Sequence, residues 1–220
     1  MHIQDGIFPP TPLGIGVLAG GAAVAIAGTA LGLRELDDER IPHVAVISAA
    51  FFVGSLIHLP VGLTSVHLIL NGLAGLMLGW CCFPALLIAL GLQLLLFGFG
   101  GVTTLGLNTA NMALPGAICY YLFRGTIRSE NFRTVFAGGF GGGFLAVLLG
   151  ALFTGASLLA AGRQFSVIAS ASVIGHLPVM VAEGFVTGSV ILFLKKVKSE
   201  MLGNGFQEKT KSERASQQSR

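Results

Sequence analysis

The chain has few charged residues, and over one long stretch it has none. Asp, Glu, Lys and Arg make up 10% of its 220 residues, whereas a typical soluble domain contains about 25%. Residues 41–123 contain none of these four residue types. A soluble protein could not cover its surface with such a stretch, and its unbroken apolar runs differ from the alternating segments of a membrane β-barrel. The composition therefore predicts an all-α, polytopic membrane protein.

Several signatures of chemistry are also missing. The chain has no P-loop with which to hydrolyse nucleotides, no HExxH motif and no nucleophile beside a base. We therefore expect a protein that is not an enzyme. The basic C-terminal tail contains a single aromatic residue, Phe206, which argues against a nucleic-acid partner. The three cysteines lie in apolar runs without CxxC spacing and are typical of small buried side chains; they are Cys81, Cys82 and Cys119.

The N-terminus lacks the basic residues with which a cleavable signal peptide begins. No Lys or Arg precedes Arg34, and Asp5 is acidic. We therefore expect the N-terminus to be retained in the mature protein. His2 is bulky, and methionine aminopeptidases need a small second residue, so Met1 should be retained as well.

Seven apolar segments predict about seven transmembrane helices. They cover roughly residues 13–33, 43–59, 65–80, 84–97, 109–123, 135–161 and 172–194. The third and fourth segments are short, and a single re-entrant hairpin is the alternative for them. We expect one transmembrane domain over residues 1–198, followed by a polar, disordered cytoplasmic tail over residues 199–220.

The positive-inside rule predicts the orientation of the chain. An odd number of spans puts the two ends on opposite sides of the membrane. Residues 124–133 contain three arginines and one Glu, and residues 195–220 contain seven basic and three acidic residues. Both regions then lie in the cytoplasm and the N-terminus lies outside. The linker of residues 34–40, with two basic and four acidic residues, does not add support.

The first two residues form a candidate metal chelate. The α-amino group of Met1, the amide nitrogen of His2 and the imidazole Nδ1 of His2 can close two fused rings on one metal ion. This near-planar arrangement leaves one in-plane position open. Square-planar nitrogen coordination suits Ni(II) and Cu(II), and it requires the amide to lose its proton. A Met-His start alone is a weak signal, because a solvated histidine is the commoner explanation.

His67 is the candidate fourth ligand, because the predicted topology places it on the outer side with Met1. Asn71 follows four residues later and is predicted to share its helical face. A metal-bound histidine usually donates its other N–H to an oxygen, and uncharged amides on the outer side could accept it. The candidates are Asn71, Gln93, Asn108 and Asn111. Polar contacts between helices explain Asn71 and Gln93 equally well.

Four further residues are candidates for the site or its lining: Asp5, His58, His176 and Glu183. His58 precedes Pro60 at a predicted outer helix end. His176 and Glu183 are seven residues apart and predicted to share a face. An acid inside the membrane is by default a functional residue. Pairing of Glu183 with an arginine or with His176 is as plausible as contact with a substrate.

At these residues the chain resembles a known family. Its start, Met-His-Ile-Gln-Asp-Gly, resembles the Met-His-Ile-Pro-Asp-Gly start of the CbiM/NikM proteins, the substrate-binding S components of energy-coupling factor (ECF) transporters for cobalt and nickel. The likeness continues through residues 66–67, 92–97, 100–106, 108–113, 175–178 and 183–184, and it extends to about Lys198. Gln4 replaces the usual proline, which makes the N-terminal segment less rigid but removes no ligand.

The resemblance implies a fold, a site and partners. The fold is an S-component helical bundle with an extra N-terminal helix, in a prokaryotic cell membrane. The metal ligands would be Met1, His2 and His67, with no permanently bound cofactor and with Co(II) or Ni(II) as the transported ion. The partners would be a CbiQ-like transmembrane coupling protein, CbiO-like ATPase subunits that hydrolyse ATP, and often a small CbiN-like membrane subunit.

Cobalt uptake for cobalamin biosynthesis is the expected function, with nickel as the alternative. A planar four-nitrogen site favours Ni(II), whereas cobalt is the commoner substrate in the family. A vitamin-type S component would need aromatic residues in the outer loops, but Trp80, Tyr120 and Tyr121 fall near the inner side. An intramembrane enzyme would need a nucleophile paired with an acid inside the membrane. Glu183 is the one acidic residue between Glu130 and Glu200 that could serve as that acid.

Overall fold

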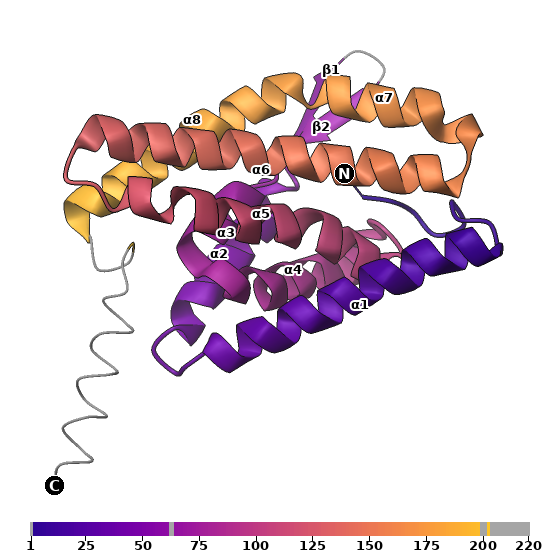
Figure 1. The fold of residues 1–220 in the computed structure, drawn as a ribbon, viewed down its shortest axis with the longest axis horizontal. Coiled ribbons are helices and arrows are strands. Elements are labelled where there is room, and N and C mark those ends of the chain that lie inside the picture. Colours follow the sequence, from indigo (N-terminus) through magenta and orange to yellow (C-terminus); the bar gives the residue numbers. More distant parts are fainter. Residues whose placement is uncertain (1, 62–63, 199–201, 203–220) are drawn as a thin grey trace, which may run out of the picture.

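The computed structural model describes residues 2–61, 64–198 and 202, and for residues 58–61, 64–67 and 163 the description is of the backbone. Met1 and nearly all of the tail, for which disorder was predicted, lie outside the described residues. The described part contains eight α-helices, two 3-10 turns and one two-stranded hairpin (Figure 1). The helices are α1 (Pro12–Glu35), α2 (Ile41–Gly54), α3 (Asn71–Leu78), α4 (Cys82–Phe97), α5 (Leu105–Ile127), α6 (Phe132–Ala161), α7 (Ser166–Gly175) and α8 (Leu177–Val197).

The helical membrane class is confirmed, but the count of seven spans is not. Four helical stretches are long and apolar enough to cross a membrane: Pro12–Glu35, Asn71–Phe97, Phe132–Ala161 and Ser166–Val197. The helix α2 is apolar but shorter. The helix α5 has 23 residues, but it is more polar because it contains Asn108 and Asn111. The predicted third and fourth segments run into one another through the turn η1 (Gly79–Cys81).

The largest departure from prediction is a hairpin where helix ends were expected. The strands β1 (His58–Val61) and β2 (Thr64–His67) pair antiparallel, with His58 opposite His67. Pro60 lacks the N–H that a helix interior needs, and the β-branched residues around it favour extended backbone. The predicted segments 43–59 and 65–80 were therefore wrong at these ends.

His67 and Asn71 do not share a helical face, contrary to prediction. His67 ends β2, whereas Asn71 is the first residue of α3. Between them Leu70 has a φ of 55°, in the left-handed region, which costs a residue with a Cβ atom about 1–2 kcal/mol. The chain therefore turns sharply between strand and helix.

The last predicted span is divided at His176. The helix α7 ends at Gly175 and α8 begins at Leu177. Pro178, in the first turn of α8, has no N–H and would crowd the carbonyl group four residues earlier in a continuous helix. His176 and Glu183 therefore do not lie on one uninterrupted helix as predicted, since His176 occupies the junction.

The helices approach closely where glycines face each other. A Cβ atom at Gly75 on α3 would collide with the backbone of Gly116 on α5. A Cβ atom at Gly139 on α6 would lie 2.8 Å from the Cα atom of Gly188 on α8. Small residues allow such backbone contact between helices in lipid. These contacts fix α3 and α8 against the central helices α5 and α6.

The two ends of the bundle differ in charge. The end of α1, the start of α2, the α5–α6 turn and the end of α8 form one end (left in Figure 1) and hold nearly all described charged residues. There Lys195 pairs with Glu130 at 3.0 Å, and Arg40 Nη2 donates to the carbonyl oxygen of Leu78 at 3.1 Å. The other end holds the N-terminal segment, the loop 98–104 and the turn η2 (Arg163–Phe165).

Substitution of Gly75 by alanine should destabilise the bundle. The added methyl group meets backbone rather than a movable side chain, and such overpacking costs about 2 kcal/mol. Thermal unfolding in detergent measures the effect. Gly16→Ala is the matched control, since a Cβ atom there meets nothing within 4 Å. A Gly75→Ala protein that melts no lower than Gly16→Ala would contradict this packing.

Candidate metal site

The N-terminal segment, residues 2–11, runs back along the bundle from the start of α1 (Figure 1). Ile3 and Phe8 are buried and belong to a cluster that includes Leu107 of α5, Leu158 of α6 and Ala169 of α7. Burial of two such side chains favours a docked segment, because each contributes about 1.5–3 kcal/mol. The apolar contacts therefore place the backbone of His2 and Ile3 against the helices.

Asn108 fixes the backbone of Ile3 from both sides. The Ile3 N–H donates to Asn108 Oδ1 at 3.0 Å, and Asn108 Nδ2 donates to the Ile3 carbonyl oxygen at 3.0 Å. The Thr104 hydroxyl donates to the same carbonyl oxygen at 2.8 Å. A carboxamide offers both an acceptor and donors without adding charge. Asn108 thus satisfies both backbone groups of Ile3, the residue next to His2, as a neighbouring β-strand would.

Asp5 fastens the segment to the loop 98–104. Its carboxylate accepts hydrogen bonds from the Thr103 hydroxyl and from the N–H groups of Val102 (2.9 Å) and Thr103 (3.1 Å). These donors, the Thr103 hydroxyl first among them, hold the pKa of the Asp5 carboxyl below its ordinary value. In this arrangement Asp5 positions the segment.

A chain of hydrogen bonds sets the tautomer of the His2 ring. The Ser55 hydroxyl donates to the Phe52 carbonyl oxygen at 2.8 Å, so its oxygen accepts from Gln93 Nε2. That orientation of the amide turns Gln93 Oε1 toward His2 Nε2, at 2.8 Å. Because an amide oxygen only accepts, Nε2 must carry a proton, and in the neutral ring Nδ1 then carries the lone pair. Chelation through Nδ1 requires this tautomer.

Gln93 is well placed to hold the ring still. It is fully buried, and the His2 ring also packs beside the ring of Phe99, with 5.8 Å between centroids. The arrangement is that expected of a metal-binding histidine whose other nitrogen donates to an oxygen acceptor.

The hairpin follows Ser55, the first member of this hydrogen-bond chain, closely in the sequence. Ser55 follows the last residue of α2 and precedes His58 by three positions, and His58 pairs with His67 across the hairpin. The backbone of His67 is thus connected to the His2 network through Ser55.

Met1 lies outside the described residues. Among those described, no group of three His, Cys, Asp or Glu side chains could hold a metal ion. A chelate built on an amine and an amide nitrogen would not form such a group.

Asn71 and Asn111 serve a different purpose from Gln93 and Asn108. Asn71 Nδ2 donates to the carbonyl oxygens of Met112 (3.1 Å) and Ala146 (3.2 Å), which ties α3 to α5 and α6. Asn111 Nδ2 lies 3.4 Å from Ser157 Oγ on α6. Both are contacts between helices.

Glu183 and His176 do not meet each other. The carboxylate oxygen Oε1 of Glu183 accepts from the N–H groups of Leu70, at 2.7 Å, and Ile69. His176 Nδ1 lies 2.6 Å from the Ser172 carbonyl oxygen. Within residues 2–61 and 64–198, Glu183 forms no ion pair with an arginine. Of the two alternatives for Glu183, pairing with an arginine or with His176 is not seen among the described residues, and its carboxylate contacts backbone instead.

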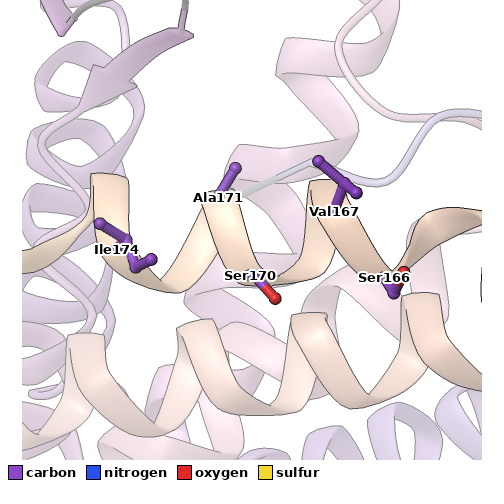
Figure 2. Close-up of a pocket in the computed structure, with 5 residues that line it drawn as sticks. All are labelled: Ser166, Val167, Ser170, Ala171 and Ile174. Carbon is purple, nitrogen blue, oxygen red and sulfur yellow. The ribbon is translucent and has the colours of Figure 1, made fainter.

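A shallow hollow on α7 is a separate feature (Figure 2). Residues from successive turns line it: Ser166, Val167, Ser170, Ala171 and Ile174. None is charged or a usual metal ligand, and Val167 and Ile174 are exposed. We assign no chemistry to this hollow.

Sequence reasoning missed Ser55, Thr103 and Thr104. The two threonines stand in a Gly/Thr-rich loop just before α5, where hydroxyl groups commonly cap helices. That position was a usable signal for polar contacts. Ser55 gave no signal, because nothing in the sequence places the end of α2 beside Gln93.

Known proteins resemble this chain along nearly its whole length. A family model described as the cobalt uptake substrate-specific transmembrane region matches residues 2–201. A putative metal transport protein of Haemophilus influenzae is 42% identical, over 92% of this chain and 97% of that protein. The fused nickel transport protein NikMN of Rhodobacter capsulatus is 32% identical, over 92% of this chain and 64% of that protein. A crystal structure of a transition metal transporter superposes with a TM-score of 0.71 at 26% identity, covering 91% of this chain and 95% of that one.

Removal of the Asn108 amide should release the N-terminal segment. In Asn108→Ala the Ile3 N–H and carbonyl groups lose their partner, which costs about 1–3 kcal/mol. Hydrogen exchange of the Ile3 amide should then accelerate by roughly tenfold or more. Asn111→Ala is the control, since it removes an amide from the same helix that contacts α6. Equal exchange at Ile3 in both variants would contradict the role of Asn108.

The Asp5 contact should make docking of the segment dependent on pH. The folded-state pKa is lowered from 3.8, so the contact contributes fully above that value and is lost as the pH falls through the lowered pKa. A spin label at position 4 reports the release. Thr103→Val removes the largest cause of the shift, so release should occur at a higher pH, and Asp5→Asn should show no titration. A midpoint that does not move in Thr103→Val would refute this assignment.

Proposed function

The chain belongs to the CbiM family, the cobalt uptake substrate-specific transmembrane proteins, and from this premise we propose that it is the metal-capture subunit of an ATP-driven ECF importer. The family resemblance drawn from the sequence is confirmed. Relatives of the chain are named as transport proteins rather than enzymes. In the proposed role the chain binds Co(II) from outside and delivers it for uptake into cobalamin biosynthesis.

The observation that carries the proposal is the hydrogen-bond chain from Ser55 through Gln93 to His2. It favours a lone pair on His2 Nδ1 in a segment whose backbone is held by Asn108 and Asp5. We propose that Nδ1 and the amide nitrogen of His2, the α-amino group of Met1 and the imidazole of His67 bind the metal. Holding the ligands in place beforehand reduces the ordering cost of binding.

The contacts of the segment compensate for one departure from the family. Gln4 stands where relatives of the CbiM/NikM type usually have a proline, which would stiffen the backbone. Here Ile3 and Asp5, on either side of Gln4, are each held by hydrogen bonds from the region around α5. The segment can therefore be ordered without the proline.

Nickel is the second candidate substrate. Four nitrogen donors in one plane suit Ni(II) better than Co(II), and the Rhodobacter capsulatus relative is named a nickel transport protein. The family description names cobalt, and we adopt cobalt for that reason.

We propose seven passes through the membrane, with an irregular third pass. The helix α3 has 8 residues and spans about 12 Å, which is too short to cross the membrane. The hairpin and α3 together would form this pass. Non-helical backbone is tolerated at membrane depth where protein covers it. The end with the N-terminal segment would face outward, and the charged end would face the cytoplasm.

The partners proposed are a CbiQ-like coupling protein, CbiO-like ATPase subunits and a small CbiN-like membrane subunit. The sequence of this chain contains no P-loop, so the energy for uptake would come from ATP hydrolysis in the ATPase subunits. Release of the metal into the cell would require those partners.

Blocking the N-terminal amine or removing the His67 imidazole should greatly weaken metal binding. Each change deletes one nitrogen ligand, and we expect the affinity for Co(II) and Ni(II) to fall by at least about 100-fold, with the metal-free melting temperature unchanged. Gln93→Leu should cost about 10–100-fold, as the loss of an outer-shell partner does. Titration of the purified protein with each metal measures the affinities, and competition between the two metals ranks them.

His43→Ala is the control for this experiment. His43 lies on α2 near the charged end of the bundle, and its Nδ1 lies 3.2 Å from the Glu39 carbonyl oxygen, so its loss should leave the affinity intact. Full affinity in both the acetylated protein and His67→Ala would overturn the proposed site.

A further inference from the structure

The connection between β2 and α3 depends on a residue that is distant in the sequence. Residues 68–70 join His67 to Asn71 without regular secondary structure of their own. Ile69 is fully buried, and Leu70 adopts the left-handed conformation. Their N–H groups are turned toward α8, where both donate to Oε1 of Glu183.

Leu70 cannot cap α3 by itself. Its carbonyl oxygen accepts the first helical hydrogen bond, from the Ala74 N–H at 2.9 Å, but its side chain has no oxygen, and no side-chain cap is present. Helix starts usually obtain an acceptor from Ser, Thr, Asp or Asn at this position. Glu183, on another helix, accepts instead from the N–H groups of Ile69 and Leu70, which precede the first turn of α3. A negative charge is also favourable near the start of a helix.

The backbone that carries Glu183 is itself held closely. A Cβ atom at Gly143 on α6 would lie 2.7 Å from the Glu183 carbonyl oxygen and 2.7 Å from Thr187 Oγ1. The helices α6 and α8 therefore touch at the level of Glu183. Because this contact leaves the Glu183 backbone little freedom to move, its side chain can hold the residues between β2 and α3 in one position.

We propose that Glu183 is a positioning residue for metal capture, which holds the β2–α3 connection and thereby the backbone of His67 in place for the metal. This rests on the proposed function, since it takes His67 as a ligand. Glu183 acts as a hydrogen-bond acceptor for Ile69 and Leu70 and does not itself contact the metal.

If Glu183 acts by accepting hydrogen bonds, its negative charge should matter much less than its side-chain oxygen. In Glu183→Gln the side-chain oxygen can still accept from both N–H groups, so hydrogen-exchange protection of Ile69 and Leu70 and most of the metal affinity should remain. In Glu183→Met, of similar length, the acceptor is gone. Protection of the two amides should be lost, and the affinity should fall by about 10–100-fold, the range for outer-shell residues.

Two controls separate this role from general damage and from failure of the proposed site. Thr187→Val alters α8 one turn away at the same contact with α6, and it should keep both the protection and the affinity. His67→Ala should lose affinity but keep the protection of Ile69 and Leu70. The exchange measurement is made without metal, so it tests the Glu183 contact even if the wild-type protein binds neither Co(II) nor Ni(II).

Three results would overturn the proposal. One is full metal affinity in Glu183→Met. Another is a Glu183→Gln protein that loses affinity as severely as Glu183→Met, which would make the charge the essential property. The third is unchanged protection of Ile69 and Leu70 in a folded Glu183→Met protein.

Discussion

Lipid offers no hydrogen bonds, so backbone that leaves helical form inside a membrane protein must find its partners within the chain. Two such stretches meet that need with side chains from helices. The N-terminal segment is paired by Asn108, and the connection after β2 is held by Glu183. The proposed metal site and the proposed role of Glu183 both depend on these two stretches.

The hydrogen bonds that orient the His2 ring come from neutral groups. Between Ser55, Gln93 and His2 every member is a hydroxyl, an amide or an imidazole. A carboxylate in place of Gln93 would also accept from His2, but it would bring a buried charge, which is costly without a paired partner. The amide instead fixes which ring nitrogen bears the proton through the direction of its own dipole.

The sequence was sufficient for the class of the protein and for α1, α4 and α6, because long apolar runs specify membrane helices almost by themselves. It was insufficient around residues 58–70. A short apolar stretch with β-branched residues can be a buried helix end or a strand, and periodicity does not separate them. The contact of Glu183 with Leu70 joins positions 113 residues apart, and no local pattern encodes it. Gln93 and Asn108 were identified as candidates by residue type, but their partners depend on the packing of α4 and α5.

The separation of charge between the two ends has a kinetic meaning for an ion that arrives from solution. The described segments at the end with the N-terminal segment contain two charged residues, Asp5 and Arg163. Their charges are of opposite sign and nearly cancel, so they create little net field in the surrounding water. Attraction over a distance, which speeds many associations and weakens with salt, is nearly absent there. In the proposed role the metal ion would reach its ligands by diffusion without electrostatic attraction. The chain would then select its ion by the affinity of the bound state and not by the rate of association.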